Sequence, residues 1–218
     1  MSEKRNEGDL SITSLIFVPF LISLAVTVLR LVGELQHWPS VLFKNGAGGV
    51  GSIVGITWLA PIFGIYFAIR LNSAGKGPAG KGRAIGFAIL GLVVAFAGGT
   101  LLRPGSAVKQ AMAYPIIAIG TLIPLLGWRD LFKILLAYGY SARVPVLILM
   151  YFAFQGAWGT HYDAVPPGFP ATTFFTKFLE LAILPQMILW IAFTILMGSL
   201  FGSISILLVR SRQVTQPA

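Results

Sequence analysis

Six long apolar runs, separated by short polar segments, dominate the pattern of the chain. A helix that crosses a bilayer needs about 20 mostly apolar residues, and the runs are close to that length. None of them alternates apolar and polar positions as a barrel strand does, so each predicts a helix. The runs cover residues 10–32, 50–71, 84–102, 111–128, about 138–158 and about 184–209. The sequence therefore predicts an all-α, polytopic integral membrane protein of about six spans, with a single transmembrane domain over residues 1–218.

Prolines inside or at the ends of the runs predict kinks, because proline removes a backbone donor from a helix. They are Pro19, Pro61, Pro115, Pro124, Pro145 and Pro185. In the fifth run, Arg143 and Pro145 leave about 15 residues free of charge, or about 22 Å of helix, against a hydrocarbon core of about 30 Å. Either the helix starts near Tyr138 and Arg143 reaches back to the interface, or residues 131–143 lie flat on the membrane. We expect an interfacial start that leads into a short span.

The composition agrees with a membrane protein. The 218 residues are 56% apolar and only 11% charged, whereas soluble domains are about half apolar and about a quarter charged. Cysteine is absent, which removes disulfides, thiolate metal sites, iron–sulfur clusters and cysteine nucleophiles. The net charge of +9 does not come from a basic stripe with interleaved aromatic residues, so we expect no nucleic-acid partner.

The basic residues predict the orientation of the chain, because cytoplasmic loops carry an excess of lysine and arginine. With the N-terminus inside, the cytoplasmic side collects Lys4, Arg5, Arg70, Lys76, Lys81, Arg83, Arg129, Lys133, Arg143, Arg210 and Arg212. The outer side collects the remaining five of the 16, Arg30, Lys44, Arg103, Lys109 and Lys177. We therefore expect cytoplasmic tails at 1–9 and 210–218, in the cytoplasmic membrane of a prokaryote.

Two sets of residues suggest contacts with lipid or between helices. Lys76, Lys81 and Arg83 lie in a glycine-rich cytoplasmic loop and could bind anionic lipid headgroups, although such a loop is also ordinary on that side. Small residues four apart, at Gly51 and Gly55 and again at Gly198 and Gly202, let helix backbones approach closely. This packing could be within one chain, which we expect, or between subunits.

Charged residues near the spans are all predicted to lie close to an interface. Arg30 and Glu34 are four apart at the end of the first span and are expected to pair. Gln155 and Gln186 are expected to bridge helices. A transporter with a charged site at its centre is therefore not favoured.

The two histidines of the chain fall on the same, outer side in this topology. Glu34 and His37 follow the first span, and His161 and Asp163 follow the fifth. Two imidazoles and two carboxylates could hold a divalent metal. A hydrogen-bonded loop beside an interfacial histidine is the milder alternative, and we expect it. A hydrogen bond from a histidine to either carboxylate would then favour the imidazolium and raise its pKa.

Hydrolase motifs are missing: there is no Gly-x-Ser-x-Gly elbow and no His-Glu-x-x-His. One stretch, LFKILLAYGYSARVPVL at residues 131–147, resembles the segment of Yip1-type membrane proteins in which an aromatic-led cytoplasmic stretch enters a helix at Tyr-Ser-x-x-x-Pro. That resemblance implies a small multi-span protein of membrane organisation or trafficking without catalytic chemistry.

The function expected from the sequence is that of a non-catalytic membrane protein. It would serve as a scaffold, assembly factor or accessory subunit whose spans bind lipids, other membrane proteins or a second copy. The alternatives are a small transporter or channel and an outer-face metal or redox site. No cofactor is expected.

Overall fold

The computed structural model describes residues 11–47, 52–102 and 107–208. Gly51 and the tails 1–9 and 210–218, which the sequence analysis singled out, lie outside these ranges. Within them every regular element is helical: α1 (Ile12–Leu35), α2 (Leu59–Ser73), α3 (Lys81–Gly99), α4 (Ala107–Leu122), α5 (Arg129–Gly156), α6 (Phe174–Phe178) and α7 (Trp190–Leu208). Short 3-10 segments, Ile56–Trp58 and Ile123–Leu126, precede α2 and follow α4. Two π-helical segments, Leu179–Ile183 and Pro185–Leu189, join α6 to α7.

Four of the described helices are long and apolar enough to cross a membrane. They are Ile12–Leu35, Lys81–Gly99, Arg129–Gly156 and the continuous helix Phe174–Leu208. The apolar helix Ala111–Leu126 is shorter, and α2 has 15 residues. The prediction of an all-α chain with several membrane-length helices is confirmed.

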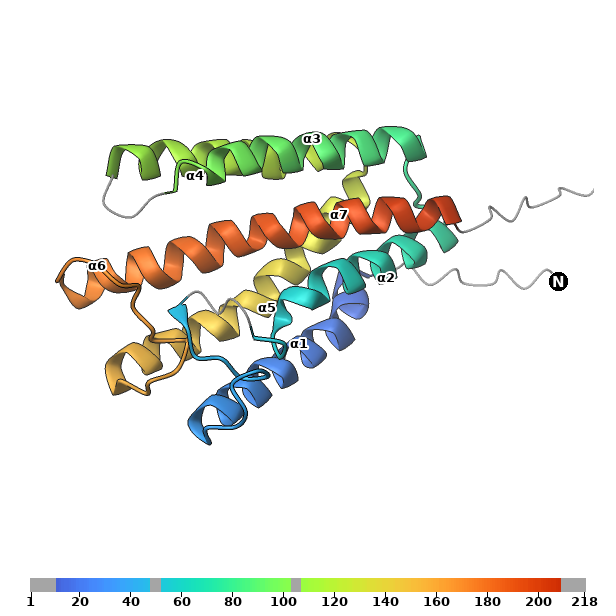
Figure 1. Ribbon diagram of the computed structural model, residues 1–218. Coiled ribbons are helices and arrows are strands. Elements are labelled where there is room, and N and C mark those ends of the chain that lie inside the picture. The colour runs from blue at the N-terminus through green and yellow to red at the C-terminus, as the bar shows by residue number, and fades with distance from the viewer. Residues whose placement is uncertain (1–10, 48–51, 103–106, 209–218) are drawn as a thin grey trace, which may run out of the picture.

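Successive helices alternate in direction, so the start of α1 and the end of α7 lie at the same end of the bundle (Figure 1). At that end the Lys81 Nζ atom donates to the Ile206 carbonyl over 2.8 Å, and Trp128 Nε1 donates to the Lys76 carbonyl over 2.9 Å. At the opposite end Asn45 Nδ2 donates to the Gly159 carbonyl over 3.2 Å. Loops that the hydropathy pattern assigns to one side of the membrane therefore meet at one end of the bundle.

Helix α7 lies at the centre of the bundle, packed against α2, α3 and α5. Its contact with α2 is close because it is made by glycines: a Cβ on Gly202 would lie 2.7 Å from the Gly64 carbonyl oxygen, and one on Gly64 would meet the backbone of Gly198. Helices α3 and α4 form a pair on one side of α7, whereas α1 packs against α5 on the other (Figure 1). The close helix contact expected at Gly198 and Gly202 is thus made within one chain.

The structure corrects the prediction for residues 131–143. They form the first half of the 28-residue helix α5, which is about 42 Å long at 1.5 Å per residue. Leu131, Leu135 and Tyr138 are buried, because their spacing of three to four residues places them on one face of the helix, against α2 and α7. Residues 131–143 therefore do not form a separate segment from the span that follows them, but belong to the same continuous helix.

Other boundaries differ for local reasons. The second run is not helical at 52–55, and Gly55, predicted to pack helices, lies in extended backbone before the 3-10 turn. The last helix begins ten residues earlier than 184, at Phe174, because the Thr173 hydroxyl accepts a hydrogen bond from the Thr176 amide and caps it. The helix changes form at two prolines: Pro124 lies in a 3-10 segment and Pro185 opens a π-helical one.

Candidate functional site

Helix α1 is polar toward the protein and apolar toward its surroundings. Its buried face carries Ser23, Thr27, Arg30 and Glu34, whereas Phe17 and Val18 are more than half exposed. This arrangement suits a helix in lipid, where apolar side chains face outward and polar ones need partners inside the bundle. Ser23 Oγ lies 2.8 Å from the Tyr138 hydroxyl of α5, and the Tyr162 hydroxyl donates to the Thr27 carbonyl over 3.1 Å.

Arg30, Glu34 and His161 form one hydrogen-bonded group. Arg30 Nε donates to Glu34 Oε1 over 2.8 Å, which confirms the pairing expected from their spacing. The backbone amide of His161 donates to Glu34 Oε2 over 2.7 Å, and His161 Nδ1 lies 2.8 Å from the same oxygen. The Glu34 side chain is fully buried. Three donors therefore satisfy a carboxylate that would otherwise be costly to bury.

The pKa of His161 is shifted in the direction opposite to the expected one. Burial lowers it below its ordinary value of 6.5, and the positive charge of Arg30 adds to this, although the hydrogen bond to Glu34 acts the other way. The contact of a histidine with a carboxylate, which the sequence left open, is therefore present, but the pKa of the imidazole is lowered and not raised. Desolvation of the charged ring outweighs its attraction to Glu34.

The four candidate metal ligands do not come together. Asp163 instead closes its own loop, accepting from the amides of Gly159 and Thr160 over 2.9 and 2.8 Å. His37 is exposed, beyond the end of α1, with a φ of 54°. Within the described ranges no group of three or more histidine, aspartate or glutamate side chains could hold a metal ion.

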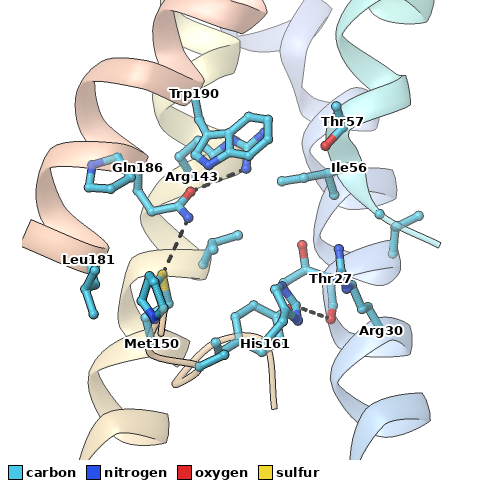
Figure 2. Close-up of a pocket in the computed structure, with 17 residues that line it drawn as sticks. Thr27, Arg30, Ile56, Thr57, Arg143, Met150, His161, Leu181, Gln186 and Trp190 are labelled. Carbon is cyan, nitrogen blue, oxygen red and sulfur yellow. Dashed lines mark hydrogen bonds between the residues drawn. The ribbon is translucent and has the colours of Figure 1, made fainter. Parts of the chain in front are cut away.

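A cavity of about 240 Å³ lies beside this group (Figure 2). Helix α1 and residues 55–57 form one wall, the π-helical segments and Trp190 form the opposite wall, and α5 lies between them. His161 lies at one end, and Tyr162 also lines the cavity. The cavity thus gathers side chains from five separate stretches of the chain.

Arg143 lies on the α5 wall of this cavity and is only 5% exposed. Its Nη1 atom donates to Gln186 Oε1 over 3.3 Å, and its guanidinium lies 4.6 Å from the centre of the Trp190 ring. In the described part of the chain no carboxylate lies within ion-pair distance of it. The expectation that Arg143 reaches the membrane interface is therefore wrong, and the cation is buried instead.

Two nitrogens of Arg143, Nε and Nη2, have no acceptor among the described residues. Every fully covered side-chain nitrogen or oxygen in those same residues does have a partner. The two nitrogens are therefore not fully covered, and Arg143 is one of the residues that line the cavity. A buried cation with an open hydrogen-bonding edge is the chemical feature that distinguishes this cavity.

Gln186 reaches Arg143 from a wall of irregular helix. Residues 179–183 and 185–189 are π-helical, a form that is rare and recurs at functional sites. Gln186 also donates from Nε2 to Met150 Sδ at 3.5 Å, so it bridges this wall to α5, as expected from the sequence. Proline at 185 cannot donate a backbone hydrogen bond, which favours the change of helix form there.

The residues predicted to bind lipid headgroups have other contacts. Lys81 caps α7, since the Ile206 carbonyl that it meets is one of the last four of that helix. The Arg83 guanidinium lies 5.5 Å from the centre of the Phe87 ring. The Lys76 side chain is exposed. A role of Lys76 and Arg83 in lipid binding stays a prediction. Gly55, which was predicted to pack helices, borders the cavity instead. A Cβ added to Gly55 would lie 3.1 Å from Arg30 Nη1.

The burial of Arg143 does not follow from its nearness in the sequence to a polar loop. The face of the helix on which Arg143 lies is the better indicator. Arg143 follows Gly139 by four residues and precedes Val146 by three, and both are buried. Positions so spaced share one face of a helix. The partners Gln186 and Trp190 come from a distant segment, and no local pattern points to them.

Comparisons of the chain with protein-family models, with curated proteins and with solved structures gave no match. The resemblance of residues 131–147 to Yip1-type proteins therefore stays a prediction. Function has to be argued from the cavity.

Proposed function

We propose that the chain is a non-catalytic integral membrane protein that binds an anionic molecule inside its membrane domain. It would cross the cytoplasmic membrane of a prokaryote six times, with both termini in the cytoplasm. The alternating helices and the shared end of α1 and α7 support this topology. The role expected from the sequence is that of a scaffold or accessory protein that binds lipids. The proposal assigns this binding to one site.

The observation that supports anion binding is the unmatched charge of Arg143. A buried cation without a counter-ion costs several kcal/mol of desolvation, and stacking on an aromatic ring returns only about 0.5–2 kcal/mol. Intramembrane ionisable residues usually mark a substrate or ion site. An anion in the cavity would supply the missing partner, because Arg143 lines the cavity and two of its nitrogens have no acceptor among the described residues.

Replacement of Arg143 by Met tests this proposal through two opposite effects. Without ligand, R143M should be at least as stable as the wild type in neutral detergent, because it removes an unpaired buried charge. Added anions should raise the unfolding temperature of the wild type and leave that of R143M unchanged. Lys133→Met is the matched control: Lys133 is exposed on the same helix, so its loss removes a charge without altering the cavity. A wild type that responds to anions no more than R143M would refute anion binding at Arg143.

A transporter is the second candidate, and the π-helical wall favours it. Irregular backbone at membrane depth occurs where it lines a cavity, and broken helices are frequent at transporter sites. Here Leu181, Pro185 and Gln186 of the π-helical segments line the cavity. Protein in liposomes should then carry the bound anion across the bilayer, and R143M should not. Binding without flux would leave a binding protein and exclude transport.

A further inference from the structure

The charges around the cavity leave a deficit of one negative charge. Arg30 is matched by Glu34, its ion-pair partner at 2.8 Å. Arg143 has no carboxylate within ion-pair distance in the described residues. A ligand with a single negative charge would therefore balance the site, whereas a ligand with two would leave an excess buried charge.

The geometry of Arg143 selects an oxyanion. The guanidinium lies over the Trp190 ring, and Gln186 accepts a hydrogen bond from Nη1. What remains is the edge formed by Nε and Nη2, two parallel donors that match the two oxygens of a carboxylate or phosphate group. A spherical ion such as chloride would use this planar pair less well.

The remaining wall selects an apolar body. Val26 of α1, Ile56, Val146 and Met150 of α5 and Leu181 line the same cavity. A small hydrated anion would leave these side chains against water, whereas an apolar group would remove them from it at about 25 cal/mol per Å². The volume of about 240 Å³ is below the roughly 300–1,000 Å³ of sites that enclose a whole drug-sized ligand.

We infer that the ligand is a singly charged amphiphile, with a carboxylate or phosphodiester at the Arg143 edge and an apolar part along Val146, Met150 and Leu181. Because the cavity is small, only the charged end and the first part of the apolar body lie inside it, and the rest extends into the bilayer. This inference rests on the proposed function, since it names the class of anion that occupies the same site.

Three probes distinguish an amphiphile from a free oxyanion. Dihexanoyl phosphatidylglycerol carries a phosphodiester with one net negative charge and short apolar chains, dihexanoyl phosphatidylcholine has the same chains without net charge, and dimethyl phosphate has the charged group alone. Binding to the purified protein in neutral detergent is measured by calorimetry at fixed ionic strength. We expect phosphatidylglycerol to bind more tightly than either other probe by about 10- to 100-fold, the value of a charge-assisted hydrogen bond.

Two variants assign this preference to Arg143. Arg143→Met should remove the preference for phosphatidylglycerol, and Arg143→Lys, which keeps the charge but loses the paired donors, should retain only part of it. Lys133→Gln, on the exposed side of α5, should leave it intact. The comparison of the three probes on the wild type holds even if a variant fails to fold.

The outcomes separate the two proposals. If dimethyl phosphate binds as tightly as phosphatidylglycerol and R143M abolishes both, the site binds anions but not amphiphiles, so this inference fails and the proposed function stands. If phosphatidylcholine, whose phosphodiester is offset by its choline, binds as tightly as phosphatidylglycerol, net charge has no part in recognition and this inference fails. If R143M also leaves the binding of both lipids unchanged, the proposed function fails as well. If none of the probes binds, both fail as well.

Discussion

His161 binds Glu34 through two donors at once, its backbone amide at 2.7 Å and its Nδ1 atom at 2.8 Å, although 127 positions separate the two residues. The contact joins the loop after α5 to the end of α1. It also places a neutral imidazole beside a buried pair of opposite charges. One carboxylate therefore joins two separate segments at this end of the bundle.

Glu34→Gln should destabilise the protein strongly. It removes the negative charge that matches Arg30, and breaking a buried pair from one side costs about 3–5 kcal/mol. Chemical or thermal unfolding in neutral detergent would measure the loss. Asp130→Asn is the control, since Asp130 is exposed in the first turn of α5. Equal effects of the two substitutions would contradict the assigned role of Glu34.

Acidification should destabilise the protein through His161. Its folded pKa lies below the ordinary value of 6.5, so the unfolded chain binds more protons as the pH falls and the equilibrium shifts toward it. Stability should be complete above about pH 6.5 and decline as the pH falls below that value. Unfolding temperatures measured between pH 8 and pH 5 would show the decline.

Two variants identify the group that titrates. His161→Asn keeps a side-chain donor for Glu34 without a titrating ring, so its profile should be flatter over this range. His37→Gln should follow the wild type, because His37 is exposed and outside the group. An unchanged profile in the His161 variant would assign the pH dependence to another residue.

An added methyl group at Gly202 should destabilise the bundle. A Cβ there would lie 2.7 Å from the Gly64 carbonyl oxygen and 3.0 Å from Ala68 Cβ, and overpacking of this kind costs about 1–3 kcal/mol. Gly86→Ala in α3 is the matched control, since a Cβ at Gly86 meets nothing within 4 Å. It should be neutral or stabilising, because alanine favours helix over glycine by up to about 1 kcal/mol. Equal unfolding temperatures for the two variants would argue against the close contact of α2 and α7.

Single cysteines can test the orientation, since the chain has none of its own. Ser73 and Ala171 are both exposed and lie in the loops at opposite ends of the bundle. A cysteine at Ser73 should resist a membrane-impermeant thiol reagent in intact cells, whereas one at Ala171 should react. Thr160, also in the outer loop, is unsuitable because it is only 1% exposed. The reverse labelling pattern would invert the topology.

The apolar helices and the close contact at Gly198 and Gly202 could be predicted from the sequence, whereas the partners of the polar side chains and the local form of the helices could not. Arg30 and Glu34 pair as expected because they are four apart on one helix. The contact of Glu34 with His161 depends on how α1 packs against α5, and hydropathy does not encode that packing. Arg143 was placed at the interface because hydropathy averages over all sides of a helix. The π-helical walls at 179–189 arise from backbone geometry that apolar periodicity does not distinguish from α-helix.

The polar face of α1 bears on how the protein is made. At about 5–20 residues per second, the ribosome needs about 6 to 25 s to pass from Glu34 to His161, 127 positions later. During that interval α1 has neither α5 nor the loop that later covers its charges. The bond between Arg30 and Glu34 lies within the helix itself, so it can form as soon as the helix does. The nascent first span therefore enters the bilayer already neutralised, and α5 completes the site after synthesis has passed it.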